Sequence, residues 1–185
     1  YRAGLEIQGI QVGPLMAAGN KPYLFVASNL GVEVFDTETT QRIGLSQIAD
    51  VHHVLADQIL GNGEIQVAYL TNHHRLVIED PMTQSILLNI PCGTTATLTL
   101  DTTFLGERLL YLTSARGHIF GLRLKQEQGV WKGTVVWSSD YLGFTPRNAV
   151  FLNSTEGPLL VTGGNPYGDG VARVAVIKPN GAILR

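Results

Sequence analysis

The sequence repeats itself with a period of 43 residues. The first copy runs from Tyr23 to Ile43, and the same order of residue types returns in the following stretch. The matched pairs are Ser28 with Thr71, Asn29 with Asn72, Val34 with Val77, Thr40 with Thr83, Gln41 with Gln84 and Ile43 with Ile86. A third copy sets Ser114 on Thr71 and Leu110 on Val67, and a fourth sets Gly163 on Ser114 after a longer interval. A repeat of this length is one supersecondary unit that buries its apolar face only by stacking on its neighbours.

Each copy reads as a series of short strands. In the first copy, residues 23–28 are almost wholly apolar, which is typical of a strand covered on both faces. Residues 32–36 alternate between the two faces of a strand, and residues 42–45 are short enough for an outer edge strand. Asp36, Glu79 and Asp80 follow third strands and are interpreted as turn residues. No stretch keeps a helical period with caps over ten residues.

These features predict an all-β fold of β-propeller blades, with about four four-stranded antiparallel blades that form part of a larger propeller. The alternative is a four-bladed ring that residues 4–8 close with the last blade. A β-sandwich or β-barrel also uses many short strands, but neither requires a repeat, so both rank lower. We expect one domain over residues 1–185, with a stray outer strand in 1–9, centred on residues 4–8. The expected blades are residues 10–48, 49–91, 92–140 and 141–185.

Composition narrows the function classes. The net charge is −2 and only 15% of residues are charged, so no basic footprint for nucleic acid is present. Apolar runs are far shorter than the roughly 20 residues that span a bilayer, which argues against direct membrane insertion. The expected partners are therefore proteins, or other domains of a larger assembly.

One segment resembles a known propeller repeat. Residues 51–69 hold an aspartate, then Gly61-Asn62-Gly63, then a strand, and this order is similar to degenerate FG-GAP or VCBS repeats of integrin-α-like propellers. The hairpin Gly31–Asp36 is similar to strands of WD40-like and quinoprotein-like propellers, the wider relatives. The resemblance implies a propeller with a binding role. Together with the sequon at Asn153-Ser154-Thr155 and the few lysines, it favours an extracytoplasmic location.

We expect the protein to bind no cofactor, and the same resemblance implies calcium binding as the alternative. Such loops bind the ion through closely spaced carboxylates, because calcium takes six to eight oxygen ligands. Here only Asp57, Asn62 and Glu64 offer oxygens, so we prefer a plain turn shaped by the glycines. The adjacent histidines His52 and His53 are further candidate metal ligands, although neighbouring strand residues point to opposite faces.

Irregular loops at one end of the blades are the expected recognition surface, because recognition residues concentrate on loops held by a rigid scaffold. The candidate binding residues are His73, His74, Arg75, Arg116, His118, Asn165, Tyr167 and Asp169.

The sequence shows no nucleophile elbow, phosphate-binding glycine loop or metalloprotease helix. We therefore favour a non-catalytic protein-binding or scaffold module. The first alternative is a fragment of a propeller enzyme, whether hydrolase, lyase or quinoprotein-like oxidoreductase. The second alternative is a structural module whose blade edges pair with other domains.

Overall fold

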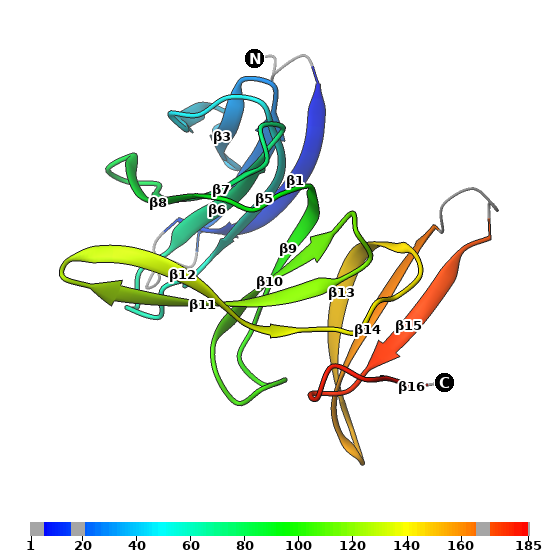
Figure 1. The fold of residues 1–185 in the computed structure, drawn as a ribbon. Helices are drawn as coiled ribbons and strands as arrows, with labels where there is room; N and C mark the ends of the chain where they lie inside the picture. Colours follow the sequence, from blue (N-terminus) through cyan, green and yellow to red (C-terminus); the bar gives the residue numbers. More distant parts are fainter. Residues whose placement is uncertain (1–5, 16–20, 166–170, 185) are drawn as a thin grey trace. The chain divides into compact units, whose positions relative to one another are not determined.

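A computed structural model describes residues 6–15, 21–165 and 171–184. Its strands form four four-stranded antiparallel sheets, and no helix occurs among these residues (Figure 1). This confirms the prediction of an all-β chain of propeller blades. No helix able to cross a bilayer is found in the part of the chain that the structure describes.

The chain divides into two compact units, each of which is described by itself. The first is Tyr1–Cys92 with Gln126–Lys132, and the second is Gly93–Lys125 with Gly133–Arg185. In all four sheets the strands are ordered as they occur in the sequence, so each sheet is an up-and-down meander.

The strand bounds are as follows. The first sheet holds β1 (Ile7–Pro14), β2 (Pro22–Ser28), β3 (Gly31–Asp36) and β4 (Arg42–Leu45). The second holds β5 (Val51–Asp57), β6 (Gln66–Thr71), β7 (Arg75–Asp80) and β8 (Ser85–Pro91). The third holds β9 (Thr95–Asp101), β10 (Leu109–Ser114), β11 (Ile119–Glu127) and β12 (Val130–Ser138). The fourth holds β13 (Thr145–Ser154), β14 (Gly157–Asn165), β15 (Arg173–Ile177) and β16 (Ile183–Leu184).

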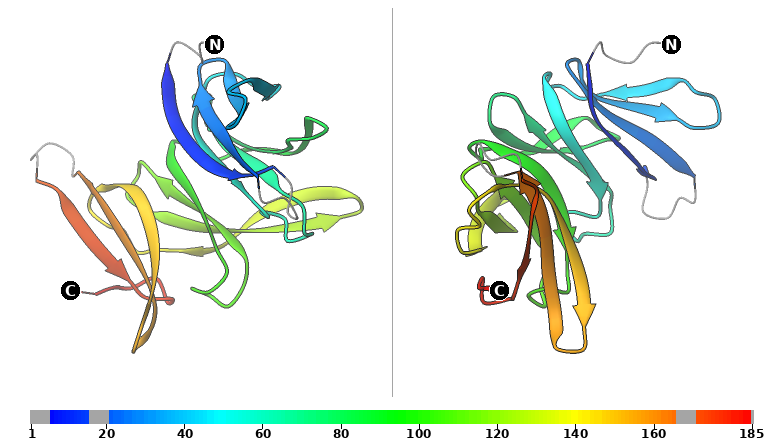
Figure 2. Two further views of the ribbon diagram at one scale, coloured as in Figure 1. Left: turned by 180° about the vertical axis from the view of Figure 1, so that it is seen from behind. Right: turned by 90° about the vertical axis from the view of Figure 1, so that its right-hand side faces the viewer.

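The first strand differs from its sequence prediction. Ile7 and Gln8 are not part of a separate outer strand, because they begin β1, which pairs with β2 and runs to Pro14. Figure 2 shows β1 in dark blue beside β2. The register shifts between Ile7 and Gly9, and this irregularity breaks the alternation that would have joined the two segments in the sequence. Residues 4 and 5 lie outside the described residues.

The second strand is the most deeply buried element of the second and third sheets, and it is largely buried in the first. All six residues of β6 and of β10 are buried, and Phe25, Val26 and Ala27 of β2 are at most 3% exposed. A strand buried on both faces needs apolar residues at successive positions rather than at alternate ones. This requirement explains the apolar runs seen in the sequence.

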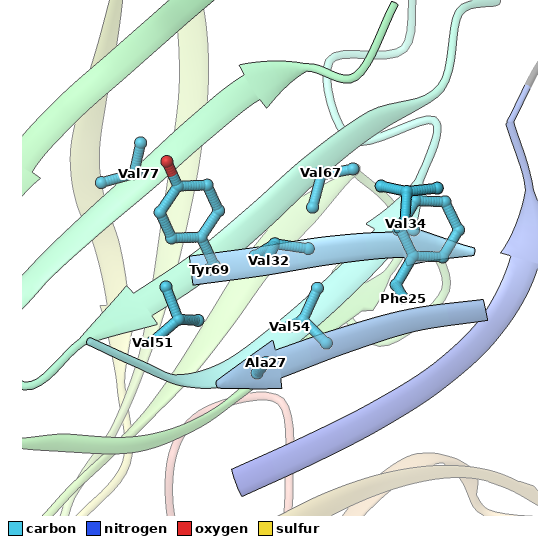
Figure 3. Close-up of a cluster of buried hydrophobic side chains, with 10 residues drawn as sticks. Phe25, Ala27, Val32, Val34, Val51, Val54, Val67, Tyr69 and Val77 are labelled. Atoms are coloured by element: carbon cyan, nitrogen blue, oxygen red, sulfur yellow. The ribbon is translucent and has the colours of Figure 1, made fainter. Parts of the chain in front are cut away.

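The core of the first unit lies between its two sheets. Figure 3 shows β2 and β3 presenting Phe25, Ala27, Val32 and Val34 to side chains of the second sheet. The side chains from the second sheet are Val51, Val54, Ala56, Val67, Tyr69 and Val77. β-Branched valines dominate this layer, and they pack well on a pleated surface.

An amide also links the first strands of these two sheets. Gln11 Nε2 donates to the Ala56 carbonyl at 3.2 Å, and Gln11 Oε1 accepts from the Ala56 N–H at 2.7 Å. Both atoms of the side-chain amide thus pair with the backbone of β5. The contact satisfies two backbone groups on the free edge of β5, with which no other strand among the described residues pairs.

The core of the second unit is more aromatic. Phe104 meets Trp137 edge to face at a centroid distance of 5.4 Å, and Tyr111 lies 4.7 Å from Phe151. Trp137 Nε1 donates to the Pro179 carbonyl at 2.8 Å, so its polar atom is satisfied. The buried cluster comprises Phe104, Leu109, Tyr111, Ile119, Leu142, Phe144, Ala149, Leu160, Ala175 and Ile177.

Two turns between second and third strands depend on glycine. Gly31 has φ +129°, and a Cβ there would lie 2.5 Å from Ser46 Oγ. Gly117 has φ +81°, and a Cβ there would lie 2.7 Å from the Tyr141 ring. In the first sheet and in the third, the segment that follows the fourth strand therefore runs directly over the glycine turn of that sheet. Only glycine combines this backbone conformation with so close an approach.

Replacement of Phe25 by alanine tests the core of the first unit. We expect Phe25→Ala to lower the free energy of unfolding by about 3–5 kcal/mol, because it removes a fully buried ring and leaves a cavity. Urea denaturation followed by circular dichroism measures this change. The control is Met82→Ala, at a side chain that is 60% exposed, which we expect to stay within about 0.5 kcal/mol of wild type. Equal effects of the two variants would contradict the assigned core.

Candidate functional site

The turn between β10 and β11 and the segment between β12 and β13 form one surface on the second unit. Leu142 N–H donates to the Gly117 carbonyl at 2.9 Å. Thr145 Oγ1 donates to the Ala115 carbonyl at 3.2 Å. The segment is anchored beneath by the buried side chains of Leu142 and Phe144. A surface loop held in this way presents its outward side chains in a fixed arrangement.

Aromatic and basic side chains meet on this surface. The centroid of the Tyr141 ring lies 5.7 Å from that of the His118 ring. The Phe120 ring is stacked with the His118 ring at a centroid distance of 6.0 Å. His118 Nδ1 lies 3.1 Å from the Ser139 carbonyl. Because a carbonyl only accepts, Nδ1 carries the proton in this contact. Arg116 is exposed at the tip of the turn, and Tyr141 is 59% exposed. We call Arg116, His118, Phe120 and Tyr141 the aromatic turn surface.

The predicted residues Arg116 and His118 therefore lie together, and the structure adds Tyr141 and Phe120 to them. Phe120 carries no distinguishing signal in the sequence, because it alternates within its strand like any other strand residue. Tyr141 carried one signal, since it opens a loop of irregular length before the fourth repeat.

The turn between β6 and β7 places the other predicted basic residues on the first unit. His73 is at the tip with a 75% exposed side chain, and its Nε2 lies 3.7 Å from Asp50 Oδ2. His74 has φ +59°, and its carbonyl accepts from Cys92 N–H at 2.9 Å. Arg75 donates from its guanidinium to the side chain and backbone carbonyl of Asn89. His74 and Arg75 thus make local structural contacts, whereas His73 is the residue that the turn displays.

The third predicted loop is only partly described. Asn165 ends β14, and its backbone pairs with Thr145. Tyr167 and Asp169 lie outside the described residues.

The candidate calcium loop is a self-contained turn. Asn62 Oδ1 accepts from Glu64 N–H at 3.2 Å and from Gln66 Nε2 at 2.9 Å. Glu64 Oε2 accepts from Asn62 Nδ2 at 2.9 Å. Asp57 Oδ1 accepts from Gln58 N–H at 2.6 Å. The oxygens proposed as ligands are thus engaged in hydrogen bonds of the turn itself.

His52 and His53 lie in β5 and are both half-buried, and the strand register shifts at His52, between Val51 and His53. Within the described ranges, no three His, Cys, Asp or Glu side chains gather as a metal site would need. The structure therefore does not join these histidines to the loop formed by Asp57, Asn62 and Glu64.

A buried acid that the sequence analysis misplaced lies in the core of the first unit. Glu79 is not a turn residue, because it lies within β7 and is only 3% exposed. Its Oε2 accepts from Tyr69 Oη at 2.8 Å, and the Gln47 N–H also donates to the carboxyl group. By contrast, Asp36 and Asp80 do shape turns, since each accepts two backbone N–H groups from the residues that follow.

Burial controls the titration of this acid. Removal from water disfavours the carboxylate and raises the pKa of Glu79 above its ordinary value of 4.5, although the hydrogen bonds from Tyr69 and Gln47 act in the opposite direction. Burial likewise raises the pKa of Tyr69, and the neighbouring Glu79 adds to this effect. The two groups border a pocket of about 10 Å³, which is room for one water molecule. The pocket is too small for a substrate, so we assign the pair a structural role.

Three of the solved structures that resemble this chain illustrate the similarity. Hydrazine synthase from Kuenenia stuttgartiensis matches with a TM-score of 0.70 at 14% identity, over 100% of this chain and 50% of that one. BBS1N, solved in complex with ARL6DN, matches with a TM-score of 0.69 at 13% identity, over 98% of this chain and 57% of that one. BamB from Moraxella catarrhalis matches with a TM-score of 0.52 at 17% identity, over 86% of this chain and 41% of that one.

These neighbours are propeller-type proteins, and the likeness establishes the propeller fold of this chain. The chain spans about half the length of the chains that it matches. No protein-family model matches the sequence, and no curated protein matches it. Sequence identities below 20% carry fold information alone.

The buried carboxyl of Glu79 predicts a pH dependence of stability. A raised pKa in the folded state means that the folded protein binds more protons than the unfolded chain above pH 4.5. Its contribution to stability is therefore present below pH 4.5 and is lost as pH rises through the folded-state pKa, by at most about 1.4 kcal/mol per pH unit. We expect Glu79→Gln, which can still accept from Tyr69, to abolish this component in urea denaturation measured across that range.

The matched control for this experiment is Glu156→Gln, at an exposed residue of the β13–β14 turn. It is expected to keep the wild-type pH dependence. A Glu79→Gln profile that runs parallel to wild type would show that the acid is not desolvated.

Chelation tests the oxygen-rich turn. We expect EDTA and millimolar calcium each to leave Tm unchanged, because the Asn62 and Glu64 oxygens are committed to hydrogen bonds within the turn. Differential scanning calorimetry measures Tm in both conditions. A calcium-dependent rise of several degrees that Asn62→Ala removes would instead establish a metal site.

Proposed function

We propose that this chain is a non-catalytic protein-binding module of a propeller, and that the aromatic turn surface contacts the partner. The observation that carries the proposal is the exposure of Tyr141 beside Arg116 and His118 on a segment that is pinned from below. Tyrosine and arginine are enriched at protein interfaces, because each combines a large contact area with polar groups.

The fixed position of Tyr141 supports a recognition role. A side chain that is already held in place loses little conformational freedom when a partner binds it. Tyr141 is held by its packing on Gly117 and by its contact with His118. The exposed phenol can therefore contribute to binding without first being ordered.

The partner class follows from the charge and from the fold. A net charge of −2 gives no basic surface for nucleic acid, which leaves proteins or other domains of an assembly as the expected partners. Among the propeller neighbours, BBS1N was solved with a bound protein, ARL6DN. We also propose that residues 51–69 form a degenerate FG-GAP or VCBS repeat. The proposed location of the protein is extracytoplasmic.

Alanine substitution at the aromatic turn surface tests the proposal. We expect Tyr141→Ala to weaken binding of the protein's partner by about 30-fold, which corresponds to a loss of about 2 kcal/mol at an interface hot spot. Arg116→Ala is expected to weaken binding in the same direction. Quantitative affinity capture identifies the partner with the wild-type protein, and titration of that partner then gives the affinity of each variant.

Lys125→Ala serves as the matched control, because Lys125 is also exposed but lies along β11, away from the turn. It is expected to bind as wild type does. Unchanged affinity of both turn variants, together with loss of binding by Lys125→Ala, would place the interface elsewhere. Circular dichroism of each variant confirms that the fold is intact.

A further inference from the structure

Arg116 carries a positive charge that the described part of the chain does not pair with an acid. Elsewhere in the chain, Lys21, Arg42, Arg123 and Lys132 each form an ion pair with an aspartate or a glutamate. No ion pair with Arg116 occurs among the described residues, although its side chain is exposed at the tip of the β10–β11 turn. Its guanidinium therefore keeps its hydrogen-bond donors for solvent or for a bound partner.

The turn that carries Arg116 is held by its own backbone. Ser114 Oγ accepts from the Arg116 N–H at 3.1 Å, and the Gly117 N–H donates to the Ser114 carbonyl at 3.0 Å. The Ser114 N–H donates to the His118 carbonyl at 2.8 Å. Because the backbone at the tip is already ordered, a partner that binds the arginine has less conformational freedom to remove.

Tyr141 supplies a second hydrogen-bond donor at the same turn. Its side chain is 59% exposed, and its ring packs on Gly117, the residue that directly follows Arg116. A phenol hydroxyl and a guanidinium both donate to carboxylate oxygens, and one carboxylate has enough acceptor sites for both donors. The aromatic turn surface thus combines one fixed charge with one fixed neutral donor.

The charges close to this surface matter more for a partner than the net charge of the whole chain. The net charge is only −2 over 185 residues, and exposed charges are largely screened beyond about 8 Å at physiological ionic strength. Two charged neighbours flank the β12–β13 segment. Asp140 is exposed, and its N–H donates to the Gly181 carbonyl at 3.0 Å. Arg173 Nη1 lies 4.0 Å from the position that a Cβ of Gly143 would take. These two opposite charges offset each other, so the charge of Arg116 decides the local preference.

We propose that the partner of the aromatic turn surface presents an acidic segment, with an aspartate or glutamate carboxylate bound by the guanidinium of Arg116 and the hydroxyl of Tyr141. This inference rests on the proposed function, because it names the chemistry of the partner that the same surface binds. A guanidinium matches a carboxylate through two parallel N–H···O bonds. A basic partner would place like charges together. A phosphate carries about two negative charges and is usually held by a cluster of arginines, whereas a single guanidinium at the turn tip matches a single carboxylate.

Zero-length crosslinking with a water-soluble carbodiimide tests the inference, because this reagent joins a primary amine to a carboxylate in contact with it. The sample is the complex of the protein with the partner that affinity capture identifies. Arg116→Lys keeps the positive charge and introduces an amine at the turn tip, whereas wild type has no amine there. We expect the variant to give a crosslink between position 116 and an aspartate or glutamate of the partner, which mass spectrometry maps.

Two controls accompany the crosslinking. Wild type is expected to lack the product at position 116, and the native amine of Lys125, exposed on β11, is expected to give no crosslink to the partner in either protein. If Arg116→Lys binds the partner but forms no crosslink to one of its carboxylates, the inference is wrong.

Charge reversal gives an independent readout. We expect Arg116→Glu to weaken binding about tenfold more than Arg116→Gln, because only the first brings a carboxylate against the acidic segment. This difference should shrink at high salt, where exposed charges are screened. Isothermal titration calorimetry at low and high salt measures it, with Lys125→Glu as the control that keeps wild-type affinity. Equal affinities of the two Arg116 variants at low salt would overturn the acidic partner.

The proposed function and this inference fail in different ways. Unchanged affinity of both Tyr141→Ala and Arg116→Ala would contradict the proposed function and, with it, the inference. Loss of binding by Tyr141→Ala, combined with equal affinities of Arg116→Glu and Arg116→Gln, would contradict the acidic partner alone. Loss of binding after phosphatase treatment of the partner would also contradict it, because a phosphate would then take the place of the carboxylate.

Discussion

Both faces of each sheet must be covered, and the rest of the structure follows from this constraint. A four-stranded meander with apolar residues on both sides cannot be stable alone, because each exposed apolar face costs free energy in water. In the first unit the problem is solved when two such sheets share one layer of side chains. The second strands β6 and β10 show the same coverage most clearly, because all of their residues are buried.

The constraint also determines where polar groups can lie. Most backbone groups pair within each sheet, and several polar side chains inside the layers find partners nearby. Glu79 accepts from Tyr69 and from a backbone N–H, and Trp137 donates to a backbone carbonyl. The side-chain amide of Gln11 pairs with the backbone N–H and carbonyl of Ala56 on the free edge of β5. The contacts of Gln11 and Trp137 each join two segments that are distant in the sequence, the first within the first unit and the second within the second unit.

The sequence predicted the fold well because the repeat encodes it in local patterns. Apolar runs, alternation and turn residues each recur in the order of the strands, and the structure places strands there. The exception is β1, where the register shift at Gly9 interrupts the alternation. The aspartates Asp36 and Asp80 were also interpreted correctly, because an aspartate that caps a turn acts only on the next few residues.

The candidate site was less predictable, since it depends on contacts between distant residues. The role of Glu79 depends on Tyr69, ten residues away, and nothing in the sequence near Glu79 distinguishes it from the turn-forming Asp80. Arg75 bonds to Asn89 on the next strand, a contact that no local sequence pattern indicates. Tyr141 gains significance only because its ring lies over Gly117.

The packing of connecting segments over glycine turns has an evolutionary consequence. At Gly31 and Gly117 even a methyl group would collide with the segment that crosses above, so these positions cannot diversify one residue at a time. The crossing segments are less restricted, since Ser46 occupies this place in the first unit and Tyr141 in the second. New binding specificities in this protein are therefore expected to arise in the connections between sheets, while the turns beneath them stay constant.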